Sequence, residues 1–163
     1  MYSQVKQPDV IKLDLLGAIK KAKSNTVYPK LTEVVKDEIW VVDAILNSEE
    51  CEILTRVAEK AGFDDALVTT GVGVGVMDKD YRDSKRVMID DIGLAEYLTE
   101  RCYEYLPRAY EGGMLDRMNE RFRFLKYAKP GQKFAPHIDG CYCKNDLERT
   151  AVTVQFYLNE GMQ

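Results

Sequence analysis

The sequence contains a single histidine, His137, among 163 residues, and this count limits the metal sites that the chain can build. It also lacks any run approaching about 18 consecutive apolar residues, so no membrane-spanning helix is predicted. The start of the chain, up to Lys12, lacks the basic-then-apolar pattern of a secretion signal. These absences predict a cytoplasmic protein whose thiols are reduced.

The charge balance lacks a basic surplus, since 23 lysines and arginines stand against 27 acidic residues for a net charge of -4. Nucleic-acid binding is therefore not predicted, because it usually requires a basic stripe. The charge is also too mild to indicate a strongly acidic or basic partner. Ten tyrosines, five phenylalanines and 45% apolar residues argue against disorder, and the length suits one domain.

Hydrophobic spacing predicts helices followed by strands. The expected elements, in chain order, are a helix within 11–22, a strand over 40–46, a helix over 48–61, a strand over 86–89, a helix over 94–105, and strands over 122–127 and 150–158. Asn47 and Glu50 form a capping-box pattern before the second helix, and Gly62 follows its last apolar residue. A turn is expected at Pro130-Gly131.

This order indicates an α+β fold with helices on one side of a sheet. The strand over 150–158 alternates most regularly, and such a strand should be paired on both edges. Too few strands are predicted to close the sheet, so we expect the chain to be part of a longer polypeptide. An open sheet edge would favour self-association.

Two cysteines, Cys51 and Cys102, share apolar helix faces and are predicted to lie in the core. The glycine-rich run over 71–76 alternates with period two. Loop residues follow it rather than a helix, which argues against a phosphate loop. A strand or a substrate flap is the better interpretation of that run.

The residues His137 and Asp139 carry the most specific chemical signal. In extended backbone they point the same way, so an imidazole nitrogen and a carboxylate oxygen can share one divalent metal. They supply two of the three ligands of the two-His, one-carboxylate triad of non-haem Fe(II) oxygenases. A bare His-x-Asp is weak on its own, because a hydrogen-bonded histidine with an acidic neighbour is common.

The surrounding sequence is more specific than the pair. The segment RFLKYAKPGQKFAPHIDG, residues 123–140, resembles the 2-oxoglutarate and Fe(II)-dependent dioxygenases of the prolyl 4-hydroxylase-like branch. The resemblance extends over residues 40–163. It includes an entry strand and helix over 41–63, an Arg-Asp-Ser, strand, helix and Leu-Pro stretch over 82–107, and a core strand over 156–159.

The resemblance implies a double-stranded β-helix, a jelly-roll relative of the cupins, with N-terminal helices packed against it. Residues 1–39 would form a peripheral helical segment, and residues 40–163 the N-terminal and early-core part of the domain, lacking its last strands. The implied activity is hydroxylation of a C–H bond in a peptide, such as at proline, or in a small molecule. Succinate and CO2 would be released.

By the same resemblance, His137 and Asp139 would ligate Fe(II) and be catalytic. Tyr127 and Tyr157 would bind the co-substrate 2-oxoglutarate, and ascorbate would keep the iron reduced. For each tyrosine, a ring packed in the sheet with its hydroxyl at the surface is the alternative.

The chain departs from the family pattern because it contains no second histidine and no late strand with the basic residue for 2-oxoglutarate. It is therefore interpreted as an incomplete dioxygenase or as a degenerate, non-catalytic binding module. A third alternative is zinc held by His137, Asp139, Cys141 and Cys143, which would require the segment to fold back at Gly140.

Overall fold

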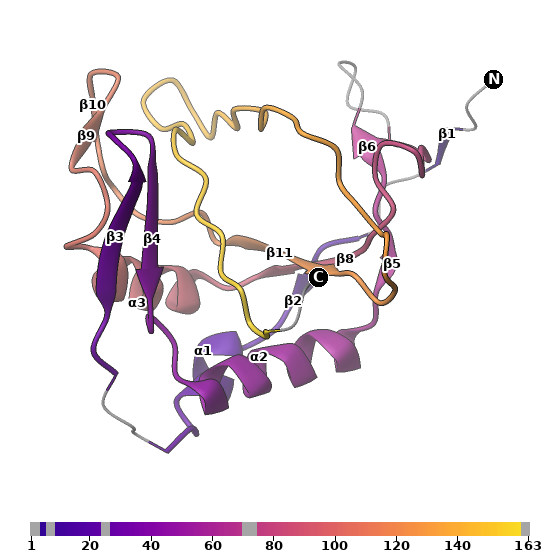
Figure 1. The fold of residues 1–163 in the computed structure, drawn as a ribbon, viewed down its shortest axis with the longest axis horizontal. Helices are drawn as coiled ribbons and strands as arrows, with labels where there is room; N and C mark the ends of the chain where they lie inside the picture. The colour runs from indigo at the N-terminus through magenta and orange to yellow at the C-terminus, as the bar shows by residue number, and fades with distance from the viewer. Residues whose placement is uncertain (1–3, 6–8, 24–26, 70–74, 161–163) are drawn as a thin grey trace.

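The computed structural model describes residues 4–5, 9–23, 27–69 and 75–160. Within these residues, three helices pack along one side of a small central sheet (Figure 1). They are α1 (Leu15–Ile19), α2 (Ser48–Ala61) and α3 (Ile92–Cys102). The architecture is α+β, as predicted, and no sheet in the described ranges closes into a barrel.

Strand β8 (Lys85–Asp90) is the centre of the main sheet. One edge of β8 pairs antiparallel with β11 (Arg121–Lys126) along its whole length. Its other neighbours are β2 (Ile11–Lys12), which is parallel, and β5 (Asp64–Asp65), which is antiparallel. The predicted strands over 86–89 and 122–127 are therefore confirmed.

Smaller strand pairs surround this sheet. Strands β3 (Lys30–Val35) and β4 (Ile39–Asp43) form a hairpin that agrees with the predicted strand over 40–46. The others are β1 (Gln4–Val5), β6 (Val68–Thr69) and β7 (Gly75–Val76) in one sheet, and β9 (Ala109–Tyr110) with β10 (Gly113–Met114) in another. Most of the predicted strand or flap over 71–76 lies outside the described residues.

Helix α2 begins and ends at the residues that the sequence indicates. The Glu50 amide donates to Oδ1 of Asn47 at 2.9 Å, and the Asn47 amide donates to Oε2 of Glu50 at 2.8 Å. These reciprocal bonds satisfy two amides that no helical carbonyl can reach. Gly62 ends the helix at a φ of +87°, a conformation that is unfavourable for residues with a Cβ atom.

Helix α1 is shorter than predicted. Residues 11–12 pair with β8 instead, because this pairing gives their backbone hydrogen bonds within the main sheet. The amides of Leu15 and Leu16, at the start of α1, donate to Oδ2 of Asp91 at 2.5 and 3.0 Å. Asp91 is also the N-cap of α3, where its Oδ1 accepts from the Leu94 amide at 2.9 Å. One carboxylate therefore fixes the starts of two helices.

The hydrophobic core lies between the helices and one face of β8. Its buried residues are Leu15, Ile19, Leu54, Ala58, Val87, Ile89, Leu94 and Leu98. Cys102 is 5% exposed, as predicted for a core residue, whereas Cys51 is only half-buried. The division between 1–39 and 40–163 stays a prediction, although α1 contributes to the same core as α2 and α3.

The predicted strand over 150–158 is wrong for this structure. No strand is assigned over these residues, although Phe156 and Leu158 do pack against the core. An extended segment becomes a strand only beside a hydrogen-bonding neighbour. In the described part of the chain no strand runs alongside it. Figure 1 shows the chain after β11, in orange to yellow, looping away from β11 on the side opposite α2 and then returning toward the sheet.

Among the described residues, no helix combines the length and the apolar character needed to cross a membrane.

Candidate functional site

The segment that carries His137 is tied to the residues preceding β8. Arg82 and Phe134 form an isolated antiparallel bridge. The Asp83 amide donates to the Lys133 carbonyl and the Ala135 amide to the Tyr81 carbonyl, both at 2.8 Å. The predicted turn precedes this bridge, with Gly131 at a φ of +81°. The backbone therefore positions the residues before His137 without a regular strand.

The structure brings His137 and Asp139 together, as their spacing predicts. Nε2 of His137 lies 3.3 Å from Oδ1 of Asp139. Nδ1 of the same ring lies 2.9 Å from the Ala135 carbonyl oxygen. Because a carbonyl can only accept, the ring donates this bond from Nδ1, and the tautomer protonated only at Nδ1 has its lone pair at Nε2. The imidazole also stacks on Phe134, with ring centroids 3.8 Å apart.

The second oxygen of the Asp139 carboxylate is held from the last segment of the chain. The Thr153 hydroxyl donates to Oδ2 of Asp139 at 2.6 Å. Sequence analysis did not assign Thr153 to the site. Its position on the polar side of the expected strand, four residues before Tyr157, was the one available signal.

This donor pair fits one divalent cation. Two donors about 2.1 Å from a common ion are about 3.0 Å apart when octahedral and about 3.4 Å when tetrahedral. The 3.3 Å separation of Nε2 and Oδ1 lies in that interval. Two electron-pair donors at this distance attract each other only with a proton or a cation between them. The side chains are also open to approach, since that of Asp139 is 56% exposed.

No third candidate metal ligand lies beside this pair among the described residues. The described residues contain no group of three histidine, cysteine, aspartate or glutamate side chains that could hold a metal. Cys141 and Cys143 have their sulfur atoms 3.9 Å apart, and the Cys141 thiol donates to the Thr150 carbonyl at 3.3 Å. The four-donor zinc arrangement therefore does not form in the described structure.

The two predicted co-substrate tyrosines have different surroundings. Tyr127 follows the end of β11, close enough to Arg82 to influence the pKa of that guanidinium. Tyr157 is 66% exposed, and no described contact joins it to His137 or Asp139. The structure therefore brings Tyr127 toward the surroundings of the pair, and for Tyr157 it shows an exposed ring.

Sequence analysis missed an arginine-rich environment beside the pair. Arg82 is buried, and its guanidinium lies 4.2 Å from the centroid of the Phe134 ring that stacks on His137. Burial lowers the pKa of Arg82, and the positive charge of Arg123 lowers it further, whereas Tyr127 and Asp139 act in the opposite direction. Burial, followed by repulsion from Arg82 and Arg123, lowers the pKa of Arg86 to about 10.

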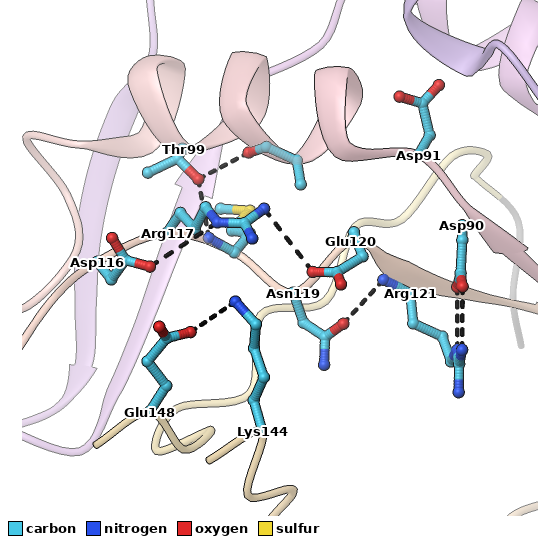
Figure 2. A network of polar contacts seen from close by, with 12 residues as sticks. Asp90, Asp91, Thr99, Asp116, Arg117, Asn119, Glu120, Arg121, Lys144 and Glu148 are labelled. Carbon is cyan, nitrogen blue, oxygen red and sulfur yellow. Dashed lines mark hydrogen bonds and ion pairs between the residues drawn. The ribbon is translucent and has the colours of Figure 1, made fainter. Parts of the chain in front are cut away.

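A depression of about 510 Å³ lies away from this pair, where α1 and α3 begin. Its lining includes Asp14, Asp90, Asp91 and Glu120. Figure 2 shows Arg121 directed at Asp90, to which it donates two bonds of 2.9 Å. Asp91 accepts from backbone amides of α1 and α3. These two carboxylates therefore already have structural partners.

No family model, no curated protein and no solved structure matches this chain.

Proposed function

We propose that the chain is part of an Fe(II)- and 2-oxoglutarate-dependent dioxygenase of the prolyl 4-hydroxylase-like kind, with a double-stranded β-helix as its complete fold. The observation that carries the proposal is the convergence of His137 Nε2 and Asp139 Oδ1 at 3.3 Å, with Nδ1 of the same ring donating to the Ala135 carbonyl. The sequence around the pair supports the same assignment. The substrate would be a peptide or a small molecule with an oxidisable C–H bond.

Bound Fe(II), with 2-oxoglutarate and O2, would supply the oxidation of the C–H bond, and ascorbate would keep the metal reduced. The residues of this chain hold and orient the ligands. The Ala135 carbonyl and the Phe134 ring fix the His137 imidazole, and the Thr153 hydroxyl fixes the Asp139 carboxylate. Partners of this kind orient metal ligands and tune affinity in metalloproteins. Tyr127 and Tyr157 are the proposed hydrogen-bond donors to 2-oxoglutarate.

The unique histidine makes metal binding directly measurable. We expect paramagnetic Fe(II), added anaerobically, to broaden the NMR signals of the His137 imidazole before other side-chain signals. Asp139→Asn should abolish this selectivity, because one donor becomes a neutral amide. Asp146→Asn, a change in the exposed loop over 144–148, is the matched control and should leave it intact. Absence of selective broadening at millimolar Fe(II), or its persistence in Asp139→Asn, would overturn the proposal.

The alternative function is a non-catalytic binding module. It is favoured because the described residues offer only two side chains, not three, as metal ligands at this site. Release of succinate from 2-oxoglutarate separates the two functions. Succinate that depends on His137 would indicate the enzyme. Iron-dependent broadening without succinate, in a chain extended by any sequence that naturally follows Gln163, would indicate the module.

A further inference from the structure

Two exposed thiols lie side by side in the segment that follows Asp139. The sulfur atoms of Cys141 and Cys143 are 3.9 Å apart, and both cysteines are free and exposed. Side chains two residues apart in extended backbone project from the same side, which explains this approach. The other two cysteines of the chain lie in helices, Cys51 in α2 and Cys102 in α3. The pair is therefore a surface dithiol, separate from the helical cysteines.

Contacts between two arms of the chain hold this dithiol in place. Cys143 forms an isolated antiparallel bridge with Arg149. The Thr150 amide donates to the Tyr142 carbonyl, and the Tyr142 amide donates to the Thr150 hydroxyl, both at 2.9 Å. The Cys141 thiol donates to the Thr150 carbonyl at 3.3 Å. These contacts join the two arms as an irregular hairpin over residues 141–150.

The tip and the base of this hairpin are fixed as well. At the tip, the Lys144 amide donates to the Glu148 carbonyl at 2.9 Å, and the two side chains form an ion pair at 2.7 Å. Beyond the base, the Thr153 hydroxyl donates to Asp139. Because contacts lie on both sides of the two cysteines, the fold keeps their thiols close together.

The backbone spacing of the pair permits a disulfide bond. Two residues of fully extended chain span at most about 7 Å, and disulfides join Cα atoms about 4.4 to 6.8 Å apart. The sulfur atoms need to approach from 3.9 Å to about 2.05 Å, which side-chain rotation and a small contraction of the backbone supply. Exposed disulfides are the ones that small thiols reduce readily. The pair is therefore suited to reversible oxidation.

We propose that Cys141 and Cys143 form a reversible dithiol–disulfide site that exchanges with small disulfides of the glutathione type. One cysteine thiolate attacks a sulfur of the small disulfide, breaks its S–S bond and releases one small thiol. The other cysteine attacks the resulting mixed disulfide, closes the bond between the two cysteines and releases the second small thiol. Two electrons and, by way of the solvent, two protons pass from the protein to the small disulfide. Excess small thiol reverses the reaction.

The test equilibrates the whole chain, under nitrogen and in EDTA, with glutathione and glutathione disulfide at stepped ratios. Acid quenching, alkylation and mass spectrometry of the peptides then identify each bond. We expect the bond between Cys141 and Cys143 to form as the proportion of glutathione disulfide rises, and to be lost again in excess glutathione. The mixed disulfide with glutathione should stay a minor product, because the neighbouring thiol displaces it. No internal bond should include Cys51 or Cys102.

Serine variants make the test specific to the pair. Cys143→Ser removes the second thiol and should stop the reaction at the mixed disulfide, so that the glutathione adduct on Cys141 rises about tenfold or more above that in the native chain. Cys141→Ser should do the same at Cys143. Cys51→Ser is the matched control, because it removes a thiol from α2 and should leave the internal bond unchanged.

Four outcomes would overturn the proposal. They are no oxidation at any ratio, a glutathione adduct as abundant in the native chain as in the Cys141 and Cys143 variants, a bond that prefers Cys51 or Cys102, or an internal bond that excess glutathione does not reduce. Circular dichroism of each variant would exclude loss of folding as the cause. The site requires no metal and goes beyond the proposed function, so failure of the iron proposal would not affect this result.

Discussion

The Thr153 hydroxyl donates a 2.6 Å hydrogen bond to Oδ2 of Asp139, across 14 positions of the chain. This bond occupies the carboxylate oxygen that faces away from His137 and leaves Oδ1 directed at Nε2. Thr153 therefore orients a candidate metal ligand and is not itself one of the proposed ligands. It also ties the last described segment to the loop that carries the site.

Replacing Thr153 should weaken metal binding without changing the set of ligands. We expect Thr153→Val to lower the affinity of the His137–Asp139 pair for Fe(II) by about tenfold or more, the usual effect of losing such a partner. Thr153→Ser retains the hydroxyl and should stay close to the native affinity. The measurement is the Fe(II) concentration at half-maximal broadening of the His137 imidazole signals. Equal losses in both variants would contradict the orienting role.

Local signals in the sequence were sufficient for the parts of the fold that depend on short-range contacts. The capping box at Asn47 and Glu50, the core position of Cys102 and the proximity of His137 to Asp139 all follow from residues close in sequence. The regular alternation over 150–158 failed because strand formation depends on a neighbouring strand, which a local pattern does not reveal. The contact of Thr153 with Asp139 also joins residues distant in sequence, so the local pattern did not indicate it.

The arginine group was missed for a related reason. Arg82, Arg86 and Arg123 come from a loop and two strands, and only the register of β8 with β11 places them together. In sequence they are ordinary charged residues. The burial of Arg82 and Arg86 is a tertiary property, so no pattern of charge or hydropathy along the chain indicates it.

Thiol reactivity should distinguish the buried cysteine from the exposed pair. We expect Cys141 and Cys143 to react first with a disulfide reagent at pH 8, because both are exposed. Cys102 should react only on unfolding, because burial raises its pKa to about 11 and blocks access. The measurement is the time course of labelling followed by mass spectrometry of the peptides. Labelling of Cys102 as fast as that of Cys141 would contradict the packing described.

The same burial predicts a pH dependence of stability. The pKa of Cys102 is about 11 in the folded chain against an ordinary value of 9.0, so folding favours the neutral thiol. Its contribution is complete below pH 9 and is lost as the pH rises toward 11, amounting to about 2 to 3 kcal/mol. Urea unfolding of Cys102→Ala should show a shallower decline over that interval than the native chain. Parallel declines would contradict the assignment.

A buried carboxylate joins α2 to α3, and its removal should destabilise the fold. Oε1 of Glu50 accepts from Arg101 at 2.7 Å and from the Tyr97 hydroxyl at 3.3 Å, while Oε2 caps α2. We expect Glu50→Ala to lower the free energy of unfolding by about 3 kcal/mol, because it leaves Arg101 without its carboxylate partner and removes a cap. Glu52→Gln, at an exposed position of the same helix, should change it by less than about 0.5 kcal/mol. The comparison is made by urea denaturation, and similar losses in both variants would be inconsistent with the network.

Asp91 should be more sensitive to substitution than an ordinary helix cap, because its two oxygens bind the starts of different helices. Oδ1 accepts from Leu94 in α3, and Oδ2 accepts from Leu15 and Leu16 in α1. Loss of a single cap costs about 1 kcal/mol, so Asp91→Ala should cost about 2 to 3 kcal/mol of unfolding free energy.

Asp14→Ala is the matched control, because Asp14 caps only α1, through the Gly17 amide, and is exposed. Asp91→Asn should fall between them, since one amide group can accept at α3 while its nitrogen cannot accept from α1. Urea denaturation of the three variants gives the order directly, and a cost for Asp91→Ala no greater than that for Asp14→Ala would show that Asp91 serves only one helix.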